Sequence, residues 1–188
     1  MRQMISDLLD YSRLQSRDID LRHISSGDAL DEAIRNLGAA IAESGAELTH
    51  DALPVVQGRQ RLLAQVFQNL LGNAIKFRGA APPRIHIFAS RADDVWRFAV
   101  RDNGIGIDPR HAETIFRVFQ RLHAREAYPG TGIGLAYCKR IVERLGGDIW
   151  VEQNEDAGST FVFTLQAAET GASPTPHDVR EDEAPGDE

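Results

Sequence analysis

Apolar side chains recur at helical spacing through residues 62–77, and this spacing predicts the central helix of the fold. The apolar members of the stretch are Leu62, Leu63, Val66, Phe67, Leu70, Leu71, Ala74 and Ile75. Its other face is polar at steps of four, four and three, which places Gln65, Asn69, Asn73 and Lys76 in one stripe. Asn is a poor helix former, so two amides in the middle of that stripe favour a binding role, although a plain surface helix would also fit.

The same spacing predicts three further helices. Residues 28–43 form one of them, with a capping box at 25–28 and a stop at Gly45. Another opens within 130–135 and runs to about residue 145. A narrow apolar strip over residues 1–15 predicts the end of a longer helix that packs on a partner helix, either in a second copy of the chain or in sequence missing upstream; a frayed terminal helix is the alternative.

Alternating and β-branched residues predict the strands. Short extended pieces are expected at 46–50 and 55–57, a hairpin at 84–90 and 95–102, and a second strand pair at 148–153 and 160–165. The chain is therefore expected to fold as an α+β two-layer sandwich, in which a mixed, mainly antiparallel sheet is covered on one face by three helices.

Composition narrows the class of protein. The chain has 188 residues and a net charge of −7, which suits one domain with appendages and argues against a non-specific nucleic-acid binder. There is no apolar run long enough to span a bilayer and no signal peptide, so a cytoplasmic location is expected. Cys138 is the single cysteine and is expected to pack in a helix.

The last part of the chain has a different composition. Residues 167–188 are Ala, Thr, Ser, Pro and Gly among seven acids and one arginine. This acidic tail is predicted to be disordered and to have no catalytic role. Solvation and weak docking are both open as its function.

Two glycine-rich stretches carry the candidate chemistry. Residues 102–107 follow a strand directly, and residues 130–135 open a helix. Glycine lets the backbone approach a ligand, and the free amides at a helix start attract phosphate. The polar stretch 117–129 between them is predicted to be a lid that closes over a polyanion.

Five segments, taken in order, resemble the boxes of the catalytic ATP-binding domain of sensor histidine kinases in two-component systems. They are 69–77, 102–107, 116–119, 130–135 and 158–160. The resemblance covers roughly residues 21–166, and the stretch 119–135 is similar to phytochrome-type and PAS-linked kinases. It divides the chain into a remnant of a dimerisation helix (1–17), the catalytic domain (18–166) and the acidic tail (167–188).

The resemblance implies that ATP lies between the helical layer and the lid. Asp102 would then accept a hydrogen bond from the adenine amino group, supported by Thr160, and Asn73 would coordinate Mg²⁺ with Asn69 beside it. Lys76 would reach a phosphate. Gly104 and Gly106 would wrap the base, the glycines of 130–134 would offer amides to the phosphates, and Phe116 and Phe119 would anchor the lid. The full set expected to bind ATP is Asn69, Asn73, Lys76, Asp102, Gly104, Gly106, Ile107, Phe119, Arg121, Gly130, Thr131, Gly132, Ile133, Gly134, Leu135 and Thr160.

The residue at position 69 bears on the reaction. Related ATPases place Glu there, and that carboxylate orients the attacking water. Asn69 cannot take a proton, which favours phosphoryl transfer to a protein over hydrolysis. None of the six histidines has the surrounding motif of a phosphoacceptor, and residues 1–14 are similar to the end of the second dimerisation helix, so the acceptor helix is expected to be missing.

The sequence thus predicts a domain that binds Mg·ATP and transfers the γ-phosphate to a histidine on a dimerisation helix missing from this chain, for relay to a response regulator. The expected partners are ATP, a receiver domain and the dimerisation helices, with no nucleic acid and no membrane segment. On its own, the chain is expected not to autophosphorylate. The alternative is a nucleotide-binding regulatory module, either an anti-sigma-factor-like serine kinase or an inactive ATP-gated partner domain.

Overall fold

The computed structural model describes residues 20–120 and 130–168. The expected terminal helix, residues 121–129 of the expected lid (117–129) and the tail beyond residue 168 lie outside this part of the chain. The elements in order are β1 (Arg22–Ser25), α2 (Ser26–Asn36), α3 (Gly38–Ser44), β2 (Glu47–His50), β3 (Val55–Gly58), α4 (Gln60–Lys76), β4 (Arg84–Ala92), β5 (Val95–Asp102), η1 (Pro109–His111), η2 (Thr114–Phe116), α5 (Gly134–Arg144), β6 (Ile149–Gln153) and β7 (Ser159–Gln166).

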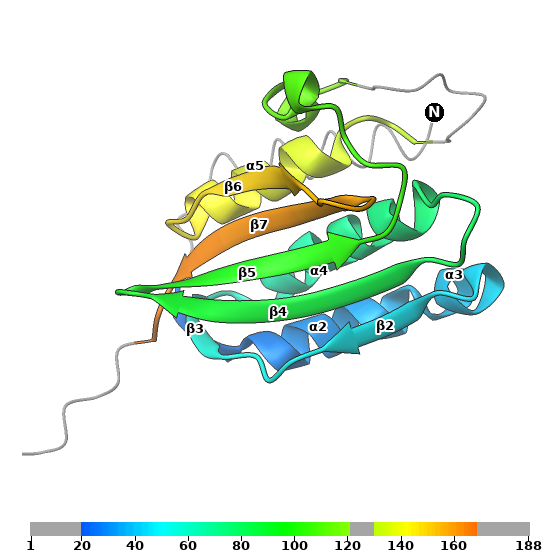
Figure 1. The fold of residues 1–188 in the computed structure, drawn as a ribbon. Helices are drawn as coiled ribbons and strands as arrows, with labels where there is room; N and C mark the ends of the chain where they lie inside the picture. Colours follow the sequence, from blue (N-terminus) through cyan, green and yellow to red (C-terminus); the bar gives the residue numbers. More distant parts are fainter. Residues whose placement is uncertain (1–19, 121–129, 169–188) are drawn as a thin grey trace, which may run out of the picture.

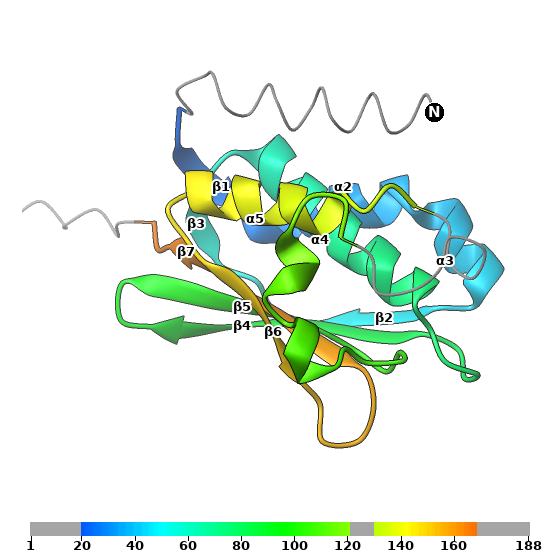
Figure 2. The ribbon, with the colours of Figure 1, turned by 90° about the horizontal axis from the view of Figure 1, so that it is seen from above.

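The main sheet has five strands in the order β2-β4-β5-β7-β6. The edge strand β2 runs parallel to β4, whereas the other neighbours are antiparallel. Helices α2, α4 and α5 lie together on one face of this sheet (Figures 1 and 2). The predicted α+β sandwich with a mixed, mainly antiparallel sheet is therefore confirmed.

Two details of the N-terminal half differ from the prediction. The helix expected over 28–43 is two helices, because Leu37 leaves the helical conformation (φ −96°, ψ 5°) between α2 and α3. The strand β3 does not join the main sheet. It pairs instead with β1, an antiparallel partner that the sequence did not predict. The predicted cap and stop are confirmed, since Ser25 Oγ accepts from the Asp28 amide at 3.1 Å and Gly45 has a φ of +64°.

The core lies between α4 and the sheet. Phe67 on α4 is fully buried and meets Phe98 of β5 and Phe163 of β7 edge to face, at centroid distances of 6.2 and 5.8 Å. The two strand phenylalanines stack on each other at 4.9 Å. This packing fixes α4 across the centre of the sheet, and so fixes its polar stripe relative to the strand ends.

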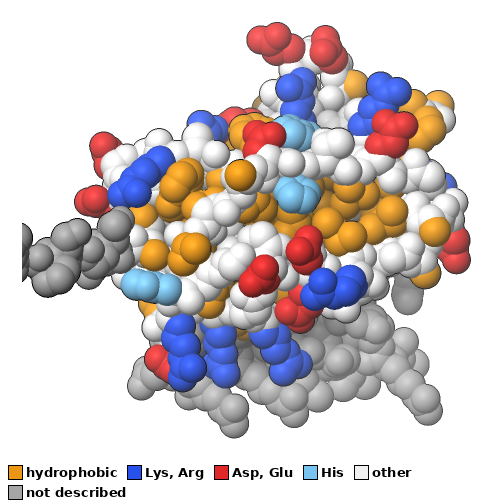
Figure 3. Space-filling model, turned by 90° about the horizontal axis from the view of Figure 1, so that it is seen from below, with side chains coloured by type: hydrophobic (Ala, Val, Ile, Leu, Met, Phe, Trp, Pro, Cys, Tyr) orange, Lys and Arg blue, Asp and Glu red, His pale blue; other side chains and the backbone are white. Residues whose placement is uncertain are grey.

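The side of the molecule on which β2 forms the edge is mixed in character. In Figure 3 hydrophobic side chains gather across its middle, Lys and Arg side chains gather along one margin, and acidic side chains are scattered elsewhere. Within residues 20–120 and 130–168, no helix is long and apolar enough to cross a membrane.

Candidate nucleotide site

The carboxylate of Asp102 is buried at the last residue of β5. The residue is 9% exposed, and its Oδ1 accepts hydrogen bonds from the amides of Gly104 at 2.8 Å and Ser159 at 3.2 Å. Burial raises the pKa of Asp102, and the two amide hydrogen bonds oppose that change. One oxygen is therefore fixed by the backbone, which leaves Oδ2 as the acceptor through which the carboxylate could bind a ligand.

A polar network supports the same strand end from the β6–β7 turn. Asn154 donates from Nδ2 to the Asp102 carbonyl at 2.8 Å, and its Oδ1 accepts from Thr160 Oγ1 at 2.6 Å. The expected support of Asp102 by Thr160 thus passes through Asn154, which the sequence analysis did not identify, as it did not identify the Ser159 amide. The sequence did contain an indication of this role, because Asn154 is the first residue of a turn and asparagines at turns commonly hydrogen-bond to nearby backbone groups.

The glycines after Asp102 pass close to the end of α4. The Ile105 amide donates to the Phe77 carbonyl at 3.0 Å, and a Cβ on Gly104 would lie 2.5 Å from the same oxygen. Gly106 has a φ of +75°, a conformation that favours glycine. The strand end and the end of α4 are thereby joined, and Ile107 follows as a half-buried residue packed against the core.

The polar stripe of α4 faces the start of α5. Gln65 Oε1 accepts from the Tyr137 hydroxyl at 3.4 Å, and a Cβ on Gly134 would lie 3.3 Å from Asn69 Oδ1. Cys138 is buried beside Asn69; burial raises its pKa to about 12, while a hydrogen bond with Asn69 acts in the opposite direction. Gln65 and Asn69 therefore contact α5, about two turns and one turn before Asn73.

Asn73 and Lys76 complete the stripe near the second glycine-rich stretch. Asn73 is half-buried. Lys76 places its Nζ 4.3 Å from the centroid of the Phe77 ring. Nζ would also lie 2.8 Å from a Cβ on Gly130, where φ is +155°. Lys76 thus reaches the backbone that leads into α5.

The two expected lid anchors behave differently. Phe116 is buried and meets Phe161 of β7 edge to face at 6.4 Å, so it attaches η2 to the sheet. The side chain of Phe119 is 51% exposed and its φ is +63°. The contact of Phe119 is made by its backbone, whose amide donates to the Gly132 carbonyl at 3.0 Å.

The remaining expected residues are distributed along the same loop and helix start. Ile133 is buried, whereas Thr131 and Leu135 are half-buried. Arg121 lies outside the described residues. The structure therefore gathers the end of β5, the second half of α4 and the start of α5 around one region, and sets a buried carboxylate apart from a stretch of backbone amides.

The side chains of the candidate site can be compared with the ligands that Mg²⁺ requires. Among the described residues no three His, Cys, Asp or Glu side chains cluster as a metal site. Asn69 and Asn73 offer amide oxygens one helical turn apart on α4. Mg²⁺ prefers oxygen ligands and usually keeps several waters and substrate phosphates, so one or two amides suit a nucleotide-bound ion.

Comparison with known proteins gives one consistent family. The sequence profile of the family described as "Histidine kinase-, DNA gyrase B-, and HSP90-like ATPase" matches residues 58–169. Cyanobacterial phytochrome A of Nostoc sp. (strain PCC 7120) is 51% identical over 165 residues, which cover 88% of this chain and 22% of that protein. Hybrid signal transduction histidine kinase B of Dictyostelium discoideum is 33% identical over 173 residues, covering 86% of this chain and 9% of that protein. The chain thus spans about a fifth or less of the length of these relatives.

Solved structures agree on the fold. Full-length ShkA in complex with AMPPNP superposes with a TM-score of 0.74 at 27% identity, covering 88% of this chain and 36% of that one. The catalytic domain of histidine kinase ThkA superposes with a TM-score of 0.68 at 24% identity, covering 79% of this chain and 96% of that one. The second likeness concerns the fold alone.

Proposed function

Because this chain belongs to the family of histidine kinase-, DNA gyrase B- and HSP90-like ATPases, we propose that it is the Mg·ATP-binding catalytic domain of a sensor histidine kinase. The observation that carries the proposal is the buried Asp102 carboxylate, held by two backbone amides at a strand end that meets the C-terminal end of α4. This arrangement offers an acceptor for a base at one end and oxygen and amide groups for phosphates at the other.

In this proposal the end of β5 binds adenine. Asp102 accepts from the exocyclic amino group, a donor that guanine lacks at that position, and Thr160 and Asn154 keep the strand end in place. Gly104 and Gly106 let the backbone wrap the base, and Ile107 adds apolar surface. The carboxylate is pre-oriented by the Gly104 and Ser159 amides, so little ordering is left for binding.

The phosphates are assigned to α4 and the start of α5. Asn73, with Asn69 beside it, would hold Mg²⁺, which neutralises phosphate charge when bound. Lys76 would pair with a phosphate oxygen. Gly130, Thr131, Gly132, Ile133, Gly134 and Leu135 would present backbone amides, and Phe119 and Arg121 would close the site from the lid.

Transfer rather than hydrolysis follows from the chemistry of position 69. An amide has no basic oxygen with which to take a proton from water, so the residues of this chain position the nucleotide without activating a water molecule. The γ-phosphate would go to a histidine on a dimerisation helix outside this chain, and then to an aspartate of a response regulator receiver domain. Such a domain would act in the cytoplasm, where ATP and receiver domains are found.

The first test is calorimetric titration of the purified chain with a non-hydrolysable ATP analogue, with and without Mg²⁺, beside GTP and an Asp102→Asn variant. We expect the chain to bind the ATP analogue, and to bind it more tightly when Mg²⁺ is present. We expect no comparable binding of GTP, and much weaker binding of the ATP analogue by the Asp102→Asn variant. A folded chain that binds neither nucleotide would contradict the proposal and favour an inactive partner domain.

The second test concerns the acceptor. The chain is incubated with labelled ATP, first alone and then with a purified dimerisation hairpin from a phytochrome-type relative. We expect no label on the chain alone and acid-labile label on the hairpin. Label that appears instead on a serine of an added protein would support the anti-sigma-factor-like alternative.

A further inference from the structure

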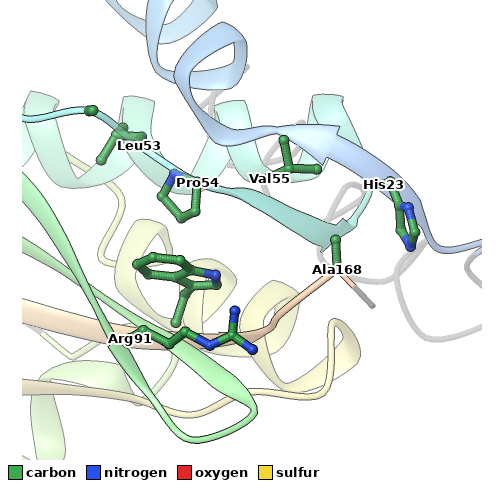
Figure 4. A pocket seen from close by; sticks show the side chains of 8 residues that line it. His23, Leu53, Pro54, Val55, Arg91 and Ala168 are labelled. Carbon is green, nitrogen blue, oxygen red and sulfur yellow. The ribbon is translucent and has the colours of Figure 1, made fainter. Parts of the chain in front are cut away.

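A cavity of about 550 Å³ lies at the end of the molecule away from Asp102. It is bounded by β1, the start of β3 with the segment before it, the β4–β5 hairpin and Ala168 just beyond β7, as Figure 4 shows. The lining residue from β5 is Trp96. It precedes Asp102 by six residues, so the spacing of residues along a strand places the two about 20 Å apart. The cavity is therefore separate from the candidate nucleotide site.

The lining combines apolar surface with cationic or polar groups. Leu53, Pro54, Val55 and Trp96 form the apolar part, and Val55 is 51% exposed. Arg91 places its guanidinium 6.0 Å from the centroid of the Trp96 ring, and His23 stands across from it on β1 (Figure 4). None of the lining residues that the structure describes is acidic. The nearby Asp93 and Asp94 lie in the hairpin turn, where their carbonyls accept from Arg91 Nε and the Ala167 amide.

The chain itself supplies a complementary segment at this place. Ala168 is both part of the lining and the last described residue, and Ala167 is fixed beside it by a bridge to Val56. The twenty residues that follow carry seven acids and one arginine, together with Pro174, Pro176 and Val179. Ten extended residues reach about 33 Å, so the acids from residue 178 onward can return to the rim. A short tether gives an effective concentration in the millimolar range.

We propose that residues 169–188 dock in this cavity, with acidic side chains paired to Arg91 and His23 and the prolines or Val179 against Trp96. The docking is a function separate from nucleotide binding. Residues 1–19 are the other candidate occupant, because they precede β1 in the chain and β1 carries His23. They are the weaker candidate, since they carry three arginines and three aspartates and offer no net charge to the cationic rim.

The test uses the two tryptophans as reporters. The full chain and a version ending at Ala168 are labelled with 5-fluorotryptophan, and a Trp150→Phe variant assigns the two fluorine resonances. Trp150 lies on β6 and bonds Glu152, so it serves as an internal control. We expect removal of 169–188 to shift the Trp96 resonance and leave that of Trp150 unchanged. In the full chain, high salt should shift the Trp96 resonance part of the way in the same direction, because salt screens the attraction between the acidic tail and Arg91.

A charge reversal distinguishes docking from a local end effect. A peptide of residues 169–188 is titrated into the version that ends at Ala168, and we expect Arg91→Glu to weaken its binding about tenfold, as for loss of one charge-assisted hydrogen bond. Arg101→Glu is the matched control, because it makes the same charge change at the other end of β5. Equal weakening by both variants, or no response of Trp96 to the peptide, would overturn the proposal. So would a Trp96 shift on deletion of residues 1–19 with none on deletion of the tail.

Discussion

Asp102 is the residue at which burial and charge oppose each other most directly. Burial raises its pKa above the ordinary value of 3.8, although the amides of Gly104 and Ser159 favour the ionised form. An aspartate whose folded pKa exceeds its unfolded pKa contributes most to stability below the unfolded pKa, and that contribution is lost as pH rises through the folded pKa. The ionised carboxylate is thus kept at some cost in stability, which a bound hydrogen-bond donor would offset.

Asp102→Asn should therefore gain stability relative to the unmodified chain as the pH rises from about 4 to about 7. The amide retains the Oδ1 acceptor for both backbone amides and removes only the charge. The measurement is a series of urea denaturation curves across that range. Asp108→Asn is the exposed control: pairing with Arg110 holds the pKa of Asp108 below the ordinary value, so its contribution changes only below about pH 4 and its difference from the unmodified chain should stay nearly constant across that range. A difference between Asp102→Asn and the unmodified chain that does not change with pH would contradict the pKa shift.

Asn154 is the residue whose importance the sequence least revealed. Its side chain bonds the Asp102 carbonyl, the Ala157 carbonyl and the Thr160 hydroxyl. Asn154→Ala should lower the free energy of unfolding by about 1–3 kcal/mol, because part-buried partners are left unpaired. It should also weaken adenine nucleotide binding several-fold. Urea denaturation and calorimetry measure the two effects.

Thr160→Val provides the partner arm of this experiment. It removes only the bond to Asn154, so its effect and that of Asn154→Ala should not add in the double variant. Simple additivity would show that the two side chains act independently and that Thr160 does not support Asp102 through Asn154.

At the scale of elements, the β6–β7 turn fixes the strand end that carries Asp102. Gly158 has a φ of +83°, and a Cβ there would overlap the Asp102 carbonyl oxygen. Gly158→Ala should destabilise the chain by more than about 1 kcal/mol through the backbone conformation alone, and should weaken nucleotide binding by moving Asp102. Gly79→Ala, which meets no atom within 4 Å, is the control that should leave both properties nearly unchanged. Thermal melts and calorimetry report the result.

Elements with a strong hydrophobic period were predictable, and those defined by tertiary pairing were not. The helix predicted over residues 62–77 is confirmed, because the structure places α4 at Gln60–Lys76. It was predictable because its apolar residues lie on one face of the helix. The break at Leu37 was hidden, since Leu37 itself continues the apolar stripe of α2. β1 has only four residues, none of them buried, and exists through its pairing with β3, so no local pattern could have indicated it.

The candidate site shows the same division. Asp102, the two glycine-rich stretches and the amide stripe were visible in the sequence, because each has an unusual residue type at an element boundary or on a helix face. The contact of Asn69 with α5 and the bridge through Asn154 depend on elements separated by many residues, and only the folded chain brings them together.

At the scale of the whole molecule, one aromatic cluster joins the helical layer to the sheet. Phe67→Ala removes a fully buried ring that meets both Phe98 and Phe163 edge to face and should cost about 3–5 kcal/mol. Phe88, which stacks on His86 and is only half-buried, is the matched control. Phe88→Ala should cost clearly less in urea denaturation. Equal losses would mean that the core is not centred on α4.

Nucleotide binding should also be visible in the stability of the whole domain. A ligand that binds only the folded state at about one hundred times its Kd adds about 2.7 kcal/mol to the free energy of unfolding, which for a domain of this size raises Tm by several degrees. We expect this rise with the ATP analogue and Mg²⁺, and a smaller one when EDTA removes the metal. Asn73→Asp should change the Mg²⁺-dependent part of the rise far more than Asn36→Asp, because Asn36 lies at the exposed end of α2 and bonds Gln68 rather than facing α5. Each variant is compared with its own melt without ligand, so that the bond lost with Asn36 does not enter the comparison. If the two variants lose the metal-dependent rise equally, the assignment of Mg²⁺ to the amide stripe of α4 is wrong.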